Sequence, residues 1–239
     1  MTPRYLVAGC TPWARRIFDK TLSKMPGEWE YCDRPEHSGE WGDTGGLDYL
    51  VGGSEFRHIF FLHWRWIVPK EIVNKHECIG FHLGRLPQER GGSPLQWRIL
   101  SERSHATLTM FRMTEGLDDG RILAEREAFP LHGAAEAVYG RAMDAAAEMI
   151  GAFLDHPELH QGWEQVGDAG VYRRRVPGDS LLPDVSEGLW DTYDRIRMMD
   201  AEGYPRAFLE YGGLRFEFDR AVLYDGRIKA DVVITEAGE

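Results

Sequence analysis

The stretch RYLVAGCTPWARRIFDKTLSKM, residues 4–25, contains the pattern that decides the fold. The apolar run at residues 4–9 ends in glycine and predicts a buried strand. Apolar residues at helical spacing then follow Thr11, a candidate helix cap, and Pro12 in the first turn. The stretch therefore predicts a strand that passes directly into a helix.

The same alternation continues along the chain. Residues 28–32, 57–64, 77–82, 105–113 and 121–129 predict strands, and residues 69–76, 93–102 and 134–156 predict helices. Alternating strands and helices are typical of an α/β fold with a mostly parallel, Rossmann-like sheet. We expect this domain to span residues 1–158.

Composition changes beyond this point. Residues 162–180 are rich in Gly, Pro and Arg, residues 189–200 predict a helix, and residues 214–224 and 228–234 predict strands joined at Asp225–Gly226, a hairpin turn signal. We expect residues 159–239 to form a small α+β appendage.

Charge and cysteine content exclude some classes of partner. The formal net charge of −11 disfavours a nucleic-acid partner, because binding to phosphate backbones needs clustered Lys and Arg. The three cysteines show no CxxC spacing, no apolar run is long enough for a membrane span, and no signal peptide is evident. We therefore expect a cytoplasmic protein that binds neither nucleic acid nor membrane.

His82 and Asp118 are the candidate catalytic pair. His82 ends a predicted strand, where parallel sheets place their ligands, and Asp118 lies in the turn GLDDG after another strand. An imidazole titrates near neutrality, and a nearby carboxylate can orient it. Taken singly, a histidine near a strand end is more often structural or simply exposed, and an Asp-Asp-Gly turn is usually only turn chemistry. The other histidines lack the HxxxH and HExxH spacings, so no metal site is predicted.

Other candidate groups have two interpretations. Arg90, Gly91, Gly92 and Ser93 precede a helix and could hold an anion or simply form its start. Trp64 and Trp66, on either side of Arg65, could line a pocket for a flat heterocycle or pack in the core. Arg173, Arg174 and Arg175 could meet a phosphate or form a solvated loop.

Two motifs at a fixed separation resemble those of the folate-dependent formyltransferase family. GFHLGRLPQERGGSPLQW, residues 80–97, resembles the signature N-x-H-x-S-L-L-P followed by R-G and P-x-Q-W, and MTEGLDDGRIL, residues 113–123, resembles the second signature with its GLD-x-G turn. His82 and Asp118 are 36 positions apart, as in that family. The likeness is strongest to sugar N-formyltransferases, including those of pseudaminic acid pathways, and weakest over residues 27–53.

The resemblance implies an enzyme with 10-formyltetrahydrofolate as cofactor and an amino-sugar nucleotide as substrate, with tetrahydrofolate as product. It implies catalytic roles for His82 and Asp118. It also implies contacts to the cofactor and to the acceptor: for the cofactor, Trp64, Arg65, Trp66, Leu86, Pro87, Gly116 and Leu117; for the acceptor, Arg90, Gly92, Ser93, Gln96, Arg173, Arg175 and Tyr204. The sequence leaves open whether the chain forms a homodimer.

Gly80 departs from the family pattern, which has a catalytic asparagine two residues before the histidine. Such a donor to an oxyanion contributes about 3 kcal/mol in comparable sites. Either another donor, Gln96 or a backbone amide, replaces it, or the chain is a folate-binding relative without turnover. Methionyl-tRNA formyltransferase and glycinamide ribonucleotide formyltransferase are the alternative activities, disfavoured respectively by the negative charge and by the lack of a Gly-rich phosphate loop near the N-terminus.

Overall fold

The computed structural model describes residues 2–33, 55–101, 104–184 and 187–238. Most of the segment with the weakest family likeness, residues 27–53, lies outside these ranges. No helix among the described residues is long and apolar enough to cross a membrane.

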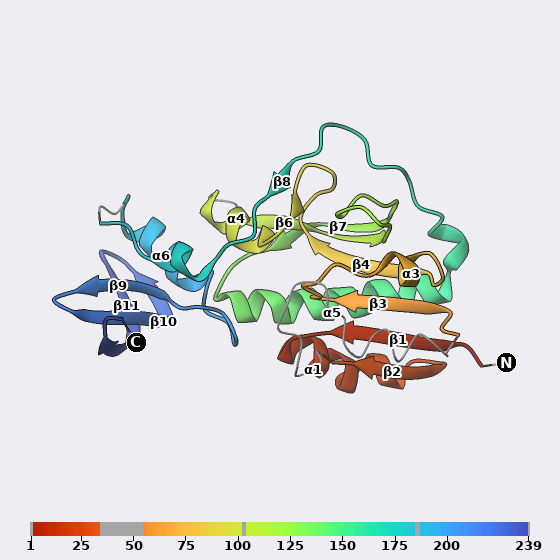
Figure 1. Ribbon diagram of the computed structural model, residues 1–239, viewed down its shortest axis with the longest axis horizontal. Coiled ribbons are helices and arrows are strands. Elements are labelled where there is room, and N and C mark those ends of the chain that lie inside the picture. The colour runs from red at the N-terminus through yellow and green to blue at the C-terminus, as the bar shows by residue number, and fades with distance from the viewer. Residues whose placement is uncertain (1, 34–54, 102–103, 185–186, 239) are drawn as a thin grey trace.

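A six-stranded sheet forms the centre of the larger domain (Figure 1). Its strands, in spatial order, are β2 (Glu28–Cys32), β1 (Arg4–Gly9), β3 (His58–Leu62), β4 (Cys78–Leu83), β6 (His105–Arg112) and β7 (Ile122–Pro130). The first four strands pair in parallel, which confirms the predicted Rossmann-like α/β fold.

β6 and β7 depart from the expected parallel arrangement, since β6 pairs antiparallel with β4 and with β7. The short turn at residues 113–121 explains the second pairing: a parallel neighbour needs a crossover of a dozen residues or more, whereas a short turn reverses the chain. The same turn contains Asp118, and its carboxylate lies close to His82 of β4.

Helices cover both faces of the sheet. α1 (Pro12–Lys20), followed by the short 3-10 helix Leu22–Lys24, and the long α5 (Ala135–Asp155) pack on one face; α3 (Lys70–Val73) lies on the other, and α4 (Pro94–Leu100) follows β4. Thr11 caps α1 as predicted, because its Oγ1 accepts from the Ala14 amide at 3.4 Å.

Alternate residues of each central strand enter opposite layers of the core. Val7 and Phe60 pack with α1 and α5, whereas Leu6 and Ile59 pack with α3 and its neighbours. All four side chains are fully buried. Burial on both faces explains why these strands are continuously apolar.

A second, three-stranded antiparallel sheet lies at the C-terminal end, to the left of the main sheet in Figure 1. It consists of β9 (Ala207–Tyr211), β10 (Leu214–Tyr224) and β11 (Arg227–Glu236), and α6 (Leu189–Arg197) precedes it. The Asp225–Gly226 turn joins β10 and β11 as predicted. The sequence analysis did not predict β9, because this strand is only five residues long.

The linker, residues 156–180, follows α5 and runs back across the larger domain (Figure 1). After the 3-10 helix Pro157–Leu159, Trp163 forms a bridge with Ile122, and β8 (Val171–Tyr172) pairs with β5 (Arg90–Gly91). A further 3-10 helix, Pro177–Ser180, ends this segment. The linker therefore contacts the loop that follows His82, and the expected boundary near residue 158 stays a prediction.

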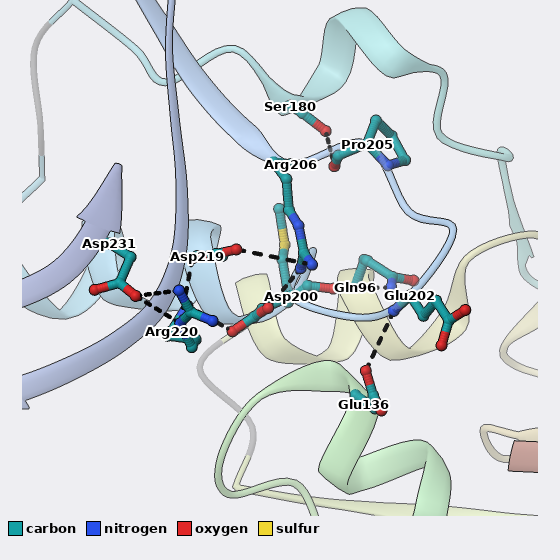
Figure 2. Close-up of polar contacts among 11 residues, drawn as sticks. Gln96, Glu136, Ser180, Asp200, Glu202, Pro205, Arg206, Asp219, Arg220 and Asp231 are labelled. Atoms are coloured by element: carbon teal, nitrogen blue, oxygen red, sulfur yellow. Dashed lines mark hydrogen bonds and ion pairs between the residues drawn. The ribbon is translucent and has the colours of Figure 1, made fainter. Parts of the chain in front are cut away.

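A group of ion pairs and hydrogen bonds fastens the second sheet to the larger domain (Figure 2). The Asp200 carboxylate accepts from the Arg206 guanidinium and from the Arg220 amide, the latter at 2.8 Å. The Glu202 amide donates to Glu136 Oε2 on α5 at 3.3 Å, and Ser180 Oγ donates to the Pro205 carbonyl at 3.2 Å. These contacts fix residues 198–205 against the larger domain.

Candidate active site

A cavity of about 650 Å³ opens at the carboxyl ends of β3 and β4. Its walls come from the segment after β3, from β4, from the start of α4, from the turn at residues 113–118, from α5, and from the linker. This volume lies within the range of pockets that hold cofactors and other small molecules, and the position is the usual one for ligands of open α/β sheets.

His82 and Asp118 face each other in this cavity, as the sequence predicts. Nδ1 of His82 lies 3.6 Å from Oδ2 of Asp118, and both residues line the cavity. His82 is buried, with 6% of its surface exposed. Asp118 adopts a left-handed backbone with φ of 48°, and its Oδ2 accepts from the Gly91 amide at 2.9 Å.

The surroundings of His82 assign different roles to its two ring nitrogens. Nε2 lies 2.5 Å from the Glu89 carbonyl oxygen, which can only accept, so Nε2 carries a hydrogen and donates it. Nδ1 is therefore the nitrogen that faces the Asp118 carboxylate and the cavity. Only this nitrogen is placed to exchange a proton with a ligand.

The loop that holds His82 is itself held by a buried carboxylate. Glu89 accepts at Oε2 from the Arg85 amide at 2.7 Å and from the Arg98 guanidinium at 2.7 Å. Tyr172 of the linker donates to the other oxygen, Oε1, at 3.3 Å. The Glu89 backbone, and with it the imidazole of His82, is thereby fixed between α4 and the linker.

An aromatic wall flanks the catalytic pair. Trp64, Arg65 and Trp66 line the cavity, and the two indole rings meet edge to face with centroids 5.0 Å apart. Gly116 and Leu117 also line it. The predicted positions of these residues beside one slot therefore fit the structure.

Leu86 and Pro87 do not lie where the resemblance implies. Neither lines the cavity, and Leu86 packs instead against Phe111 and Ile122 in a small separate core. Leu86 is turned away from the cavity because it packs against β6 and β7. Leu86 and Pro87 support the slot from behind and do not form its surface.

Phe111 fills the space beside Gly80. A Cβ atom at Gly80 would lie 2.8 Å from Cε1 of Phe111 and 3.2 Å from Cγ of Met113. Contacts below 3.0 Å require one of the groups to move. An asparagine at this position would therefore require the Phe111 ring to move.

Gln96 does not supply the missing donor. Its Nε2 donates to the Met198 carbonyl at 3.0 Å and to the Tyr139 hydroxyl at 3.2 Å, which uses both amide hydrogens. This finding corrects the expectation that Gln96 could replace the asparagine. A backbone amide remains as the other predicted donor.

The predicted acceptor residues fall into two groups. Gly92, Ser93, Gln96, Arg175 and Tyr204 line the cavity, but Arg90 and Arg173 do not. The Arg90 guanidinium donates twice to Gln165, and Gln165 in turn donates to the Asp118 carbonyl. Arg90 thus supports the turn that carries Asp118.

Arg173 is directed to the outer side of the linker. Its guanidinium pairs with Asp179 and lies 5.2 Å from the centroid of the Trp97 ring. The next two residues, Arg174 and Arg175, line the cavity instead. The run of three arginines signalled an anion site but not which of its members faces inward.

Arg65 and Arg174 make one wall of the cavity cationic. The pKa of Arg174 is lowered, first by burial and then by the charge of Arg65, so the two cations lie close enough to repel. The Arg65 guanidinium lies 4.8 Å from the centroid of the Tyr204 ring. An anionic ligand group between these side chains would relieve the repulsion.

Sequence reasoning missed His63 and Tyr139, which both line the cavity. His63 has a left-handed backbone with φ of 54°, an uncommon conformation for a residue other than glycine. Its pKa is lowered to about 3 by burial and by the charges of Arg65 and Arg174. The only signal in the sequence was its position directly after the β3 strand.

Among the described residues, no group of three or more His, Cys, Asp or Glu side chains could hold a metal ion.

A structure of methionyl-tRNA formyltransferase from Clostridium thermocellum matches with a TM-score of 0.82 and 33% identity, covering 98% of this chain and all of that one. The chain belongs to the formyltransferase family of enzymes. A family model described as the methionyl-tRNA formyltransferase C-terminal domain matches residues 177–235, within the second sheet and the segment leading to it.

Other members of the family differ from this chain in length or in sequence. The methionyl-tRNA formyltransferase of Ehrlichia ruminantium (strain Gardel) is 27% identical over 161 residues, which are 66% of this chain and 51% of that protein. The chain thus spans about half the length of the curated relatives it matches.

Two distant structures share the fold. A sugar N-formyltransferase from Shewanella sp matches with a TM-score of 0.61 and 18% identity, covering 99% of both chains. HypX from Aquifex aeolicus, solved in complex with tetrahydrofolic acid, matches with a TM-score of 0.73 and 16% identity, covering 92% of this chain and 38% of that one.

Proposed function

We propose that this formyltransferase transfers the formyl group of 10-formyltetrahydrofolate to the primary amine of an amino-sugar nucleotide. The observation that carries the proposal is the position of the His82 and Asp118 pair, between an aromatic slot and a cationic wall of one cavity. The slot suits a flat pterin, and the cationic wall suits the phosphates of a nucleotide.

The aromatic slot suits a reduced pterin in its chemistry. Trp64 and Trp66 offer flat apolar surfaces, and Leu117 is an apolar side chain with 56% of its surface exposed at the slot's edge. When bound there, 10-formyltetrahydrofolate supplies the formyl group. An exposed leucine beside two tryptophans gains burial when a ligand covers it.

His82 and Asp118 would move the proton that formyl transfer releases. The acceptor amine must be neutral to attack, and the new C–N bond places an extra proton on its nitrogen. Nδ1 of His82 takes this proton, with Asp118 stabilising the imidazolium, and returns it to the folate nitrogen as the old C–N bond breaks. The Glu89 carbonyl keeps the ring in the required orientation throughout.

The cationic wall would select an acceptor with phosphate groups. Arg65, Arg174 and Arg175 line the cavity in a chain whose net charge is −11, so the positive charge is local to this site. Burial lowers the pKa of both Arg174 and Arg175, which means that their charges are incompletely solvated. A nucleoside diphosphate would compensate them.

Methionyl-tRNA is the second candidate acceptor, favoured by the match to the enzyme from Clostridium thermocellum and by the C-terminal family model. The charges of the second sheet speak against it. Arg206, Arg215 and Arg220 each pair with Asp or Glu side chains, so they are poorly placed to bind a phosphate backbone. A folate-binding relative without turnover is the third candidate, favoured by Gly80.

One assay separates the three candidates. The purified full chain is mixed with 10-formyltetrahydrofolate and either UDP-, GDP- and dTDP-linked amino sugars or methionyl-tRNA, and released tetrahydrofolate is followed by absorbance. We expect release only with an amino-sugar nucleotide. Release with methionyl-tRNA alone would assign the second function, and ligand binding without release across the panel would assign the third.

A further inference from the structure

A chain of hydrogen bonds runs through five buried or half-buried side chains at the floor of the cavity. Trp13 Nε1 lies 3.1 Å from His63 Nδ1, and His63 Nε2 lies 3.0 Å from the Tyr204 hydroxyl. The Tyr204 hydroxyl lies 3.0 Å from that of Tyr139, which Gln96 Nε2 also contacts at 3.2 Å. The proton transfer proposed for His82 uses none of these contacts.

The indole of Trp13 fixes the direction of the two bonds at His63, and the Tyr204 hydroxyl donates to that of Tyr139. An indole nitrogen can only donate, so Nδ1 of His63 accepts from Trp13, and neutral His63 must carry its hydrogen on Nε2. Nε2 therefore donates to the Tyr204 oxygen, and Tyr204 donates to Tyr139. Protonated His63 would place an N–H against the Trp13 N–H, consistent with its pKa of about 3.

The orientation of Gln96 is fixed in the same way. The Met198 carbonyl can only accept, so the amide nitrogen of Gln96, and not its oxygen, must face it. Gln96 thus donates to Met198 and to Tyr139. Figure 2 shows Gln96 at the junction between the two parts of the molecule, where this carbonyl belongs to the segment leading into the second sheet.

Two polar groups remain without a partner when these directions are fixed. The Tyr139 oxygen accepts two hydrogen bonds, and no described residue accepts its hydroxyl hydrogen. Gln96 Oε1 is buried and has no hydrogen-bond partner among the described residues. Tyr139 has 6% and Gln96 has 1% of its surface exposed, and both residues line the cavity.

Leaving such groups unpaired is costly. A buried polar atom without a partner costs about 1 to 3 kcal/mol, so a native protein keeps such a pair where a ligand or water completes it. Here one group is a donor and the other an acceptor, and they belong to side chains in direct contact. A ligand group that can both accept and donate would satisfy both.

We propose that Tyr139 and Gln96 bind a neutral hydroxyl or secondary amide of the acceptor sugar, with the Tyr139 hydroxyl donating to it and Gln96 Oε1 accepting from it. This inference rests on the proposed function and adds an element of sugar specificity to it. A carboxylate or phosphate would be rejected here, because it has no hydrogen to offer Gln96 Oε1. The pair therefore differs from the arginine wall in the chemistry it selects.

The rigid chain behind Tyr139 would make this recognition selective. The ring of Trp13 stacks on that of Tyr139 with centroids 4.9 Å apart, and the Tyr204 hydroxyl donates to the Tyr139 oxygen, so the ring and its oxygen are held in place. A site built to hydrogen-bond a substrate hydroxyl discriminates strongly against an analogue that lacks it, because its own polar groups are left unpaired. Acceptors without the hydroxyl or amide should bind poorly.

The test measures binding of the acceptor and not only turnover. Dissociation constants of the full chain, with tetrahydrofolate present, are determined by calorimetry for UDP- and dTDP-linked 4-amino-4,6-dideoxyhexoses. Analogues lack one group at a time: the 3-hydroxyl, the 2-hydroxyl or, in a 2-acetamido sugar, the acetamido group. The variants are Tyr139→Phe and Gln96→Leu, with Tyr31→Phe as control. The Tyr31 hydroxyl is also buried and has no hydrogen-bond partner in the part of the chain that the structure describes, but it lies outside the cavity.

We expect deletion of one of these groups to weaken binding to the unaltered protein about tenfold, the loss typical of one or two neutral hydrogen bonds. In Tyr139→Phe the same deletion should cost clearly less, about threefold, since one of the two partners is already absent and only Gln96 Oε1 remains. Tyr31→Phe should behave like the unaltered protein. The sugar group whose deletion is coupled to Tyr139→Phe is the group that Tyr139 binds, and this identifies it as a hydroxyl or an acetamido group.

Three results would overturn the inference, and they differ in what else they affect. Binding by the unaltered protein of no amino-sugar nucleotide would reject the proposed function together with this inference. Tight binding in which no deletion couples to Tyr139 would reject this inference alone. Because Gln96→Leu also loses the bond to Met198, a folded Gln96→Leu variant that binds every analogue like the unaltered protein would likewise reject it.

Discussion

The ring of Phe111 occupies the space that a side chain at Gly80 would need. A Cβ atom at Gly80 would lie 2.8 Å from Cε1 of Phe111, so the chain cannot simply regain the asparagine of the family signature. The replacement of asparagine by glycine and the position of the aromatic ring belong to one packing arrangement.

Gly80→Asn should therefore destabilise the protein and should not raise turnover. Overpacking of a buried site costs about 1 to 3 kcal/mol, which thermal denaturation would detect as a lower midpoint. Phe111→Ala opens this space. Gly80→Asn should therefore lower the midpoint less in the Phe111→Ala variant than in the unaltered protein. An unchanged midpoint in Gly80→Asn would show that the ring moves freely.

His82→Ala and Asp118→Asn should each lower the turnover of the acceptor by at least about 100-fold, because a positioned acid or base contributes this much to proton transfer. Asp119→Asn is the matched control, since this carboxylate lies in the same turn and contacts Thr114. Turnover near normal in either of the first two variants would reject the assigned roles. The measurement is the initial rate of tetrahydrofolate release.

Glu89→Ala should impair both stability and turnover. The change leaves Arg98, whose side chain is 16% exposed, without its partner, and breaking such a pair costs about 3 kcal/mol. It also loosens the backbone that holds Nε2 of His82, so kcat should fall. Urea denaturation and initial rates give the two values.

Glu127→Ala provides the matched control for Glu89. Glu127 pairs with Arg85 on the surface, where such pairs contribute at most about 1 kcal/mol. We expect little change in either measurement. Equal losses of stability and turnover in the two variants would contradict the role given to Glu89 in holding His82.

Stability should fall as the pH is lowered from about 6.5 toward 3, in part because of His63. An unfolded histidine binds a proton near pH 6.5, whereas the folded protein resists protonation of His63 until its pKa of about 3. The unfolded state thus binds more protons in this window, and each such group contributes about 1.4 kcal/mol per pH unit to the slope.

His63→Gln should flatten this part of the profile, measured by urea denaturation between about pH 4 and 6. His132→Asn, at an exposed position, should leave the slope unchanged. An unaltered slope in His63→Gln would mean that the imidazole is already protonated in the folded state, and the directed hydrogen-bond chain through Tyr204 would then be wrong.

The fold and the proximity of His82 and Asp118 were predictable because local pattern determines them. The strands are continuously apolar where both faces are covered, as at residues 59–62, and the short GLDDG turn could only join neighbouring strands. The motifs around His82 and Asp118 indicated the two elements that meet in the cavity. Their spacing carried information that neither residue carries alone.

The remaining site residues depend on contacts between distant segments. Arg174 and Arg175 line the cavity and Arg173 does not, and the sequence has no signal for the two-residue strand β8 that precedes them. In the sequence Arg90 is as plausible an anion-binding residue as Arg174. In the structure its guanidinium binds Gln165 and does not line the cavity. Tyr139 is one apolar-face residue of a long helix and becomes distinctive only beside Gln96 and Tyr204.

The return path of the linker across the larger domain makes catalysis a property of the undivided chain. Residues 172–177 form part of the cavity wall although they follow the last helix of the Rossmann-like domain in sequence. A hybrid enzyme that takes only the second sheet from a relative would keep its original cavity wall, because no described residue of β9, β10 or β11 lines the cavity. An exchange intended to alter the acceptor has to begin upstream of Trp163, where the chain first rejoins β7.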